Sequence, residues 1–263
     1  MIASFNLLTS FRQWPPRLQA FSIHFAISFV IFVVLLTLMV RFWFPQYLFN
    51  SDGGWEALRL LIGVDLVLGP VLTLVVYKQG KKHLKVDLAL IGLLQISCLV
   101  IGMGIVYKER PLGVVFSDNR FLSISQGTFD FAGTDSRALE DYPNTYPRYI
   151  YIPFPEDPEE RKALRRRQTG EGPLHGRPDH FAKYADHAHK VAKEGGVSVA
   201  EIKTKYPDLT PSIDKWLEKT GYTEETIVWV PYHGRYKSTY LILDPKTGVV
   251  LGQIPNRLNP KNV

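Results

Sequence analysis

The stretch LIGVDLVLGPVLTLVV, residues 61–76, is apolar along its whole length except for one carboxylate, Asp65. Positions 60–76 contain twelve Leu, Ile or Val residues. Each favours membrane insertion by up to about 0.3–0.6 kcal/mol near the bilayer centre, whereas an Asp there costs about 2.5–3.5 kcal/mol. The sum favours insertion, so the stretch predicts a membrane-spanning helix that carries a buried acid.

Two other stretches predict spans of their own. Residues 18–40 contain no charge and would cover roughly 35 Å as a helix, and residues 88–107 are also uncharged. The three expected spans are therefore about 18–40, 57–77 and 88–107. The first is too long for the apolar core of a signal peptide and lacks a small-residue cleavage site after it, so we expect an uncleaved anchor.

The positive charges predict how these spans are oriented. Residues 1–110 carry ten Lys or Arg against five Asp or Glu, whereas residues 111–263 have a net charge of only +1. The loop between the second and third spans, KQGKKHLK, has four lysines and no acid. Such loops stay in the cytoplasm, so the basic excess reflects membrane topology, and we expect no nucleic-acid binding.

The expected domains follow from this orientation. Residues 1–17 would form a cytoplasmic N-terminus, residues 18–110 a three-helix transmembrane domain, and residues 111–263 a periplasmic domain of a protein in the bacterial inner membrane. Trp43, Tyr47 and Trp55 are expected at the outer face of the bilayer, where aromatic side chains gather.

Asp65 needs a polar partner inside the helix bundle. Because the second span descends and the third ascends, Gln95 and Ser97 should lie at the depth of Asp65. Gly69, one turn away, would let a neighbouring backbone approach closely. Pro70 should kink the helix and free a carbonyl near position 66.

Three roles for this polar contact remain open. It can be a hydrogen bond that fixes the bundle, a contact with the membrane helix of another protein, or part of a proton or ion path. His24 of the first span lies nearer the cytoplasmic end, which makes it a less suitable partner for Asp65. Three helices with one acid also make a poor proton relay.

The segment FNSDGGWEALRLL, which leads into the second span, reads as a helix start. Ser51 or Asp52 can cap the helix, and acids suit its positive end. Gly53 and Gly54 allow a sharp turn. The remaining expectations are that Trp55 anchors at the interface and that Glu56 pairs with Arg59, three residues later.

This segment, together with the span that follows it and KQGKKHLKVDLALIGLLQ, resembles the type IV pilin accessory proteins, the TfpX/TfpZ family. The similarity is densest over roughly 45–125 and includes RPLGVVFSDNRFLSIS. The matching positions are Ser51, Asp52, Gly53, Gly54, Trp55, Asp65, Gly69 and Pro70. The resemblance implies a small inner-membrane protein that helps its pilin to accumulate or to assemble into pili. Beyond about residue 125 only the layout matches.

The predicted periplasmic domain is of the α+β class. An antiparallel hairpin is expected over 113–125, followed by an extended or edge segment with RYIYI as a short strand. Tyrosines of that segment are expected to cover the domain's own core, and the alternative is an aromatic edge that accepts a partner strand. Helices are expected over 157–168, 178–194, 198–206 and 211–220, and the sequence closes with a three-stranded meander around PYHGRY and DPKTG.

Motifs for catalysis are sparse. Cys98 is the only cysteine and lies in a predicted span, and no GxSxG, HExxH, Walker or dinucleotide-binding motif is present. His175, His180, His187 and His189 read as ordinary surface histidines. We therefore expect no catalytic residue, no metal site and no cofactor.

The first hypothesis is a non-catalytic accessory or chaperone protein that binds the major type IV pilin, through its membrane helix and its periplasmic head, within the lipid bilayer. Contact with other inner-membrane components of the pilus is a further expectation. The alternative is a membrane-bound enzyme that modifies the pilin or a lipid-linked substrate, with Asp52 and Glu56 near His233. A sensor that binds a ligand is a third hypothesis.

Reporter fusions test the predicted topology. Alkaline phosphatase fused to the carboxyl end should be active, because the enzyme folds only outside the cytoplasm. The same reporter placed in the lysine loop should be inactive, and a cytoplasmic fluorescent protein should give the reverse pattern. A silent phosphatase and a bright fluorescent protein at the carboxyl end would contradict the three-span prediction.

Overall fold

The structure is a computed structural model in which residues 13–253 are described. Most of the predicted cytoplasmic segment 1–17 and the last part of the predicted periplasmic domain, 254–263, lie outside the described residues. The chain forms two compact units. We call them the helical unit, Met1–Phe42 with Gly54–Tyr107, and the α+β unit, Trp43–Gly53 with Lys108–Val263. The short segment Trp43–Gly53 thus folds with the later residues, although the sequence-based boundary placed it in the transmembrane domain.

Among residues 13–253 three helices are long and apolar enough to cross a membrane, over Pro16–Trp43, Gly54–Val76 and Leu84–Lys108. They belong to the helical unit except for their last residues Trp43 and Lys108. They have 28, 23 and 25 residues, which is sufficient for a hydrocarbon core roughly 30 Å thick. Many of their large apolar side chains are exposed in the isolated chain, which suits a surface covered by lipid. This half of the predicted fold class is confirmed.

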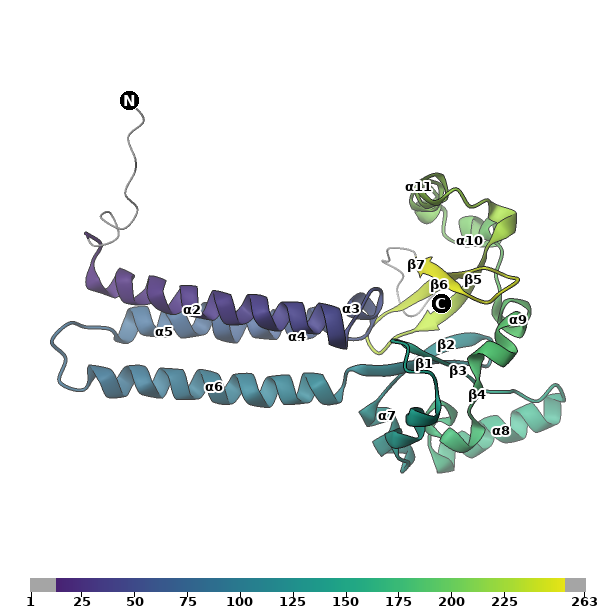
Figure 1. Ribbon diagram of the computed structural model, residues 1–263, viewed down its shortest axis with the longest axis horizontal. Coiled ribbons are helices and arrows are strands. Elements are labelled where there is room, and N and C mark those ends of the chain that lie inside the picture. The colour runs from purple at the N-terminus through teal and green to yellow at the C-terminus, as the bar shows by residue number, and fades with distance from the viewer. Residues whose placement is uncertain (1–12, 254–263) are drawn as a thin grey trace. The chain divides into compact units, whose positions relative to one another are not determined.

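Two of the three spans are not uniform α-helices. The elements of the helical unit are α2 (Pro16–Leu38), η1 (Met39–Trp43), α4 (Gly54–Leu61), η2 (Ile62–Leu68), α5 (Gly69–Val76) and α6 (Leu84–Lys108). Both η1 and η2 are stretches of π-helix. The first span packs along the second, with α2 against η2 and α5, whereas among the described residues α6 makes no comparably close backbone approach (Figure 1).

The α+β unit is built on one mixed seven-stranded sheet with the order β4-β3-β1-β2-β5-β6-β7. The strands are β1 (Pro111–Ser117), β2 (Arg120–Ser125), β3 (Arg148–Tyr151), β4 (Ala182–Lys183), β5 (Val228–His233), β6 (Ser238–Leu243) and β7 (Val250–Gln253). β1 pairs antiparallel with β2 and parallel with β3, and β2 pairs parallel with β5. The final three strands form the predicted antiparallel meander.

The predicted hairpin over 113–125 is also confirmed. Its turn residues Asp118 and Asn119 both have positive φ, +49° and +66°. Two consecutive positive φ angles match the right-handed twist of paired strands, and Asp and Asn tolerate this conformation better than most residues.

Helices complete the α+β unit. They are α3 (Leu48–Ser51), α7 (Gln126–Ala132), α8 (Pro158–Glu171), α9 (Tyr184–Gly195), α10 (Val199–Lys205) and α11 (Thr210–Thr220), with short 3₁₀ turns between them. Asp157 caps α8 as predicted, because its carboxylate accepts the amides of Glu159 and Glu160 at 2.8 and 2.9 Å. The helix predicted from 178 begins only at Tyr184, since a 3₁₀ turn and β4 occupy residues 178–183.

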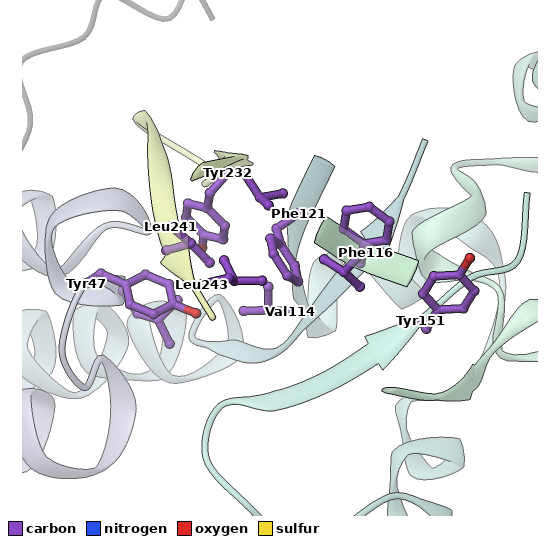
Figure 2. Packing of buried hydrophobic residues seen from close by; sticks show 11 residues of the cluster. Tyr47, Val114, Phe116, Phe121, Tyr151, Tyr232, Leu241 and Leu243 are labelled. Carbon is purple, nitrogen blue, oxygen red and sulfur yellow. The ribbon is translucent and has the colours of Figure 1, made fainter. Parts of the chain in front are cut away.

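The sheet separates apolar clusters on its two faces, because successive side chains of a strand point to opposite sides. Val114 and Phe116 of β1 belong to one cluster, shown in Figure 2, and Val115 between them belongs to another. The first cluster also contains Tyr47 and Leu48, which lie before the second span in the sequence. The segment between the first two spans therefore supplies part of the core of the α+β unit.

Several tyrosines form part of the core of the α+β unit. Tyr47 is 2 % exposed and its ring packs edge-on against Tyr232 with centroids 5.2 Å apart, so its expected place in an interfacial belt is wrong. Tyr149 and Tyr151 pack on the core of their own domain, as predicted. Their strand β3 lies between β1 and β4 and is not an edge strand.

Candidate functional site

A change of helical register prepares the polar site of the second span. In η2 the backbone bonds run between residues five apart, and the N–H of Gly69 donates to the carbonyl of Val64. In that register the next residue, Pro70, would bond the carbonyl of Asp65, but proline has no N–H. The freed carbonyl is thus that of Asp65, one residue before the predicted position 66. π-Helical turns of this kind are frequent at functional sites.

Gln95 of α6 supplies the missing donor. Its side-chain amide Nε2 donates to the Asp65 carbonyl oxygen at 3.3 Å and to the carboxyl oxygen Oδ1 at 3.1 Å. Asp65 is 5 % exposed and Gln95 is 7 % exposed. The other carboxyl oxygen of Asp65, Oδ2, is buried, and the Ser28 hydroxyl of α2 lies beside the carboxyl as a further donor. Gln95 and Ser28 therefore face the acid from the third and from the first span.

Gly69 makes room for this contact. A Cβ atom at position 69 would lie 1.9 Å from Nε2 of Gln95 and 2.2 Å from its Cδ, far inside contact distance. Only glycine therefore allows the Gln95 amide to sit where it does. The structure brings together Asp65, Gly69, Pro70 and Gln95 from the predicted set.

Ser97 does not join them, and this expectation needs correction. Ser97 is exposed, on a different side of α6 from Gln95. Two residues along an α-helix correspond to a rotation of roughly 200°, so a side chain at the right depth can still face away.

A second set of polar residues lies on the first two spans, and of these sequence reasoning considered only His24, as a less suitable partner for Asp65. His24 of α2 and Thr73 of α5 are hydrogen-bonded, with Nδ1 and Oγ1 2.6 Å apart. Ser28, 2 % exposed, lies beside the Asp65 carboxyl. The sequence pattern that indicates this set is a spacing of four residues, which places side chains on the same face of a helix. It separates His24 from Ser28, and it separates Gly69 from both Asp65 and Thr73.

An apolar groove lies next to this polar site. It has a volume of about 330 Å³, and its walls are side chains of the second span from Ala57 to Asp65 and of the third span from Gln95 to Val106. Asp65 and Gln95 are the polar lining residues at one end, and Cys98 lines the groove between the spans and is exposed. We call this feature the interspan groove.

The outer-loop motif has a role different from the predicted one. Asp52 is 3 % exposed within the α+β unit and accepts three hydrogen bonds, from Ser51 Oγ at 2.6 Å, from the Tyr232 hydroxyl at 2.6 Å and from the backbone N–H of Arg235 at 3.1 Å. Burial raises the pKa of Asp52, and the neighbouring hydroxyl groups of Ser123, Ser51 and Tyr232 oppose this rise. Asp52 is therefore an internal acceptor of the domain, and the expectation that it caps the second span is wrong.

Neighbouring residues of the motif bind the turn between β5 and β6. The Ser51 carbonyl accepts the N–H groups of Tyr236 and Lys237 at 2.9 and 3.1 Å. Gly53 has φ +109°, and a Cβ there would lie 2.7 Å from the Tyr236 ring. This glycine is required both by its backbone conformation and by the close aromatic ring.

The rest of the motif begins the second span. Gly54 is the first residue of α4, and Trp55 is 41 % exposed, as an interfacial anchor would be. One carboxyl oxygen of Glu56, Oε2, is buried without a hydrogen-bond partner in the described part of the chain. Arg59 is exposed, and the predicted Glu56–Arg59 ion pair is not among those formed by the described residues.

A polar cleft of about 490 Å³ lies in the α+β unit and bears on the enzyme hypothesis. Asp52 and His233 both line it, together with an ion pair between Glu109 and Arg235. The Asp52 carboxylate is already bound by three donors. Burial lowers the pKa of His175, another lining residue, to about 4.

The histidines of residues 175–189 do not converge. His187 stacks on Tyr151 with ring centroids 4.6 Å apart, which is a packing contact. No group of three or more potential metal ligands occurs within residues 13–253.

Comparison with known proteins identifies relatives of the chain. It is 31% identical over 107 residues to the fimbrial assembly protein of serogroups C1 and C2 of Dichelobacter nodosus, an alignment that covers 82% of that relative and 40% of this chain. This chain belongs to the fimbrial assembly protein family. The relatives from serogroups E1 and I of the same organism are 29% and 28% identical over 134 residues, half of this chain. The chain spans about half the length of these two curated relatives.

No family model and no solved structure matches the chain. The resemblance to type IV pilin accessory proteins is confirmed at the level of the family by the fimbrial assembly relatives.

For this fimbrial assembly protein, Gly69→Ala should act by displacing Gln95. The added methyl group occupies the position of the amide, so the mutant should lose about 1 kcal/mol of stability, the usual size of an interhelical polar contact. In a Gln95→Ala background the same substitution should cost little. Thermal unfolding in mild detergent measures both, and Gly92→Ala is the control because a Cβ there meets nothing within 4 Å. An equal cost of Gly69→Ala in both backgrounds would contradict the steric argument.

A second substitution tests the outer-loop motif of the family member. Asp52→Ala removes the acceptor of three donors and should lower the free energy of unfolding of the α+β unit by about 3 kcal/mol. Asp52→Asn should cost less, because its amide oxygen still accepts the Arg235 N–H. Pulse proteolysis of the full chain in increasing urea measures the change. Asp208→Ala, at an exposed acid of the same unit, should have almost no effect; a similar loss in both Ala variants would refute the assigned role of Asp52.

Proposed function

We propose that this chain is a non-catalytic accessory protein of type IV pilus assembly that binds a pilin in the bacterial inner membrane and supports its stability or assembly. Membership of the fimbrial assembly protein family supports the pilus context. The observation that carries the binding role is the interspan groove, an apolar recess between two candidate membrane spans that ends at Asp65 and Gln95.

A binding groove of this kind suits a pilin before assembly. A membrane protein that awaits assembly holds its apolar segment as a helix, whose backbone bonds are already made internally. Another protein can then recognise it only through side-chain packing and a few polar contacts. The interspan groove offers both, with apolar walls from Ala57 to Val64 and Asp65 at the end.

In this proposal the N-terminus lies in the cytoplasm and the α+β unit lies in the periplasm. The charge pattern supports this orientation. The fold supports one part of it independently, because Trp43–Gly53 and residues after Lys108 form one unit and must share a compartment. The two candidate spans between these segments, Gly54–Val76 and Leu84–Lys108, return the chain to the same side.

A role for the α+β unit follows from this placement. On the periplasmic side it would face the pilin head, and we propose that it contacts the head while the spans hold the helix. The polar cleft beside Asp52 supports a binding surface better than a catalytic one, since the buried carboxylate is engaged by hydroxyl and amide donors.

Affinity purification from piliated cells tests the proposal. The tagged full chain, extracted in mild detergent, should bring the major pilin with it, and deletion of the gene should lower pilin abundance and surface pili. An untagged strain is the control for non-specific recovery. Recovery of no pilin, together with normal piliation of the deletion strain, would refute the proposal.

The intact mass of pilin separates the binding role from the enzyme alternative. Pilin from the deletion strain and from the parent strain should have the same mass. A mass difference that is restored by complementation would instead support a modifying enzyme.

A further inference from the structure

The α+β unit is joined to the candidate membrane spans at three residues, which we call the junction residues. The first span ends at Trp43, the second begins directly after Gly53, and the third ends at Lys108; all three residues belong to the α+β unit itself. The spans have 23 to 28 residues and are longer than the hydrocarbon core, so their ends lie in the polar headgroup layer, which is roughly 5–8 Å thick on each side. Side chains of the α+β unit that contact the junction residues therefore reach this layer.

The α+β unit leaves few large apolar side chains exposed. They are Phe131, Tyr146, Tyr222, Tyr236 and Val249. Phe131 is the extreme case, because it is 78 % exposed, more than any other large apolar residue within residues 13–253. An aromatic ring so fully uncovered marks a surface that another molecule covers.

Phe131 lies close to the end of the third span. Its neighbour in α7, Asp130, forms an ion pair with the junction residue Lys108, with Oδ2 and Nζ 2.7 Å apart. Glu109, the next residue of the chain, accepts a hydrogen bond from Oγ of Ser125, the N-cap of α7, at 3.2 Å. Phe131 and Glu109 also line the same polar cleft. These contacts fix α7, and with it Phe131, beside the third junction.

Two exposed tyrosines lie at the other two junctions. The N–H of Tyr236 donates to the carbonyl of Ser51 at 2.9 Å, and a Cβ at Gly53 would lie 2.7 Å from the Tyr236 ring. The Tyr146 hydroxyl donates to the carbonyl oxygen of Trp43 at 2.8 Å. Three of the four exposed aromatic residues of the α+β unit thus accompany the three junction residues, one at each.

The headgroup layer suits aromatic rings in these positions. Aromatic side chains gather between hydrocarbon and water, where an apolar ring leaves water while a polar group stays hydrated. The turn that carries Tyr236 also carries the exposed Lys237, and a lysine stem can lie on apolar surface while its ammonium group reaches the lipid phosphates. Lipid surrounds the junctions whether or not a partner protein is bound, so it is the occupant that the position of these rings favours.

We propose that the α+β unit rests on the bilayer surface through the rings of Phe131, Tyr146 and Tyr236, which we call the junction aromatics. The partner of this surface is lipid, and the inference does not depend on pilin binding. The peptide bonds at the junctions keep the unit near the membrane but leave its orientation free. The junction aromatics add a preferred side, so the opposite side of the unit is the one left open to partners.

Fluorescent labels on single cysteines test the proposal. Cys98 is the only cysteine of the chain, so Cys98→Ser gives a background in which Phe131→Cys, Tyr236→Cys or Val249→Cys adds one thiol. Each thiol carries nitrobenzoxadiazole, and the full chain is placed, one copy per disc, in nanodiscs of phosphatidylethanolamine and phosphatidylglycerol. A lipid with a nitroxide near its headgroup should quench the labels at positions 131 and 236 several times more strongly than the label at 249. Iodide in the water should give the reverse order.

Val249 is the matched control, because it is 55 % exposed in the same unit and is not among the residues that contact a junction. A label on the native Cys98 controls for insertion, since this thiol lies in the third span and should be quenched by a nitroxide deep in the acyl chains. Its quenching by iodide would overturn the proposal together with the three-span topology.

Equal quenching by iodide at positions 131, 236 and 249 would overturn the proposal in favour of a surface that faces water. Protection of 131 and 236 from iodide that appears only after pilin is added to the discs would overturn it in favour of a pilin-binding surface, and the proposed function would then stand. Quenching by the headgroup nitroxide without pilin supports lipid as the partner.

Discussion

A carboxylate taken out of water must be matched by hydrogen-bond donors, and this constraint governs both parts of the molecule. Two aspartates are almost fully buried, and their surroundings differ. Asp52 receives donors from Ser51, Tyr232 and the backbone of Arg235, so both of its oxygens are matched within the α+β unit. Asp65 shares one amide of Gln95 between its carbonyl and a single carboxyl oxygen. Asp52 is thus satisfied within one unit, whereas Asp65 connects the second span to the third through Gln95 and to the first through Ser28.

The backbone of the second span explains why Asp65 needs hydrogen-bond donors from other helices. The π-helical stretch and Pro70 remove the ordinary helix partner of the Asp65 carbonyl, which leaves two kinds of acceptor at one residue. Gly69 then admits the Gln95 amide from the third span. The second and third spans thus share one polar arrangement, formed by Asp65, Pro70, Gly69 and Gln95. The structural role of each of these residues depends on the other three.

Much of this site could be predicted from the sequence, because the depth of a residue in a span follows from counting along an apolar helix. Counting placed Gln95 opposite Asp65, yet it also placed Ser97 there, since depth carries no information about direction around the helix. The pairing of Asp52 could not be predicted. Its local sequence matches a helix cap, and the groups that bind it come from residues 232–235, far along the chain. Sequence rules for turns and caps succeeded where both partners were near neighbours, as at Asp157 and in the hairpin at Asp118.

The insertion of Tyr47, Leu48 and Asp52 into the α+β core also bears on how the protein is made. Their binding partners in β5 and β6 are synthesised about 180 residues after them, and contacts between such distant residues form late in folding. Until these strands have been made, the loop therefore has an uncovered tyrosine and an unpaired acid. The loop can be enclosed only after the strands have reached its side of the membrane. The late strands therefore close the domain over a loop made early, and a chain that lacks them would leave Tyr47 and Asp52 uncovered.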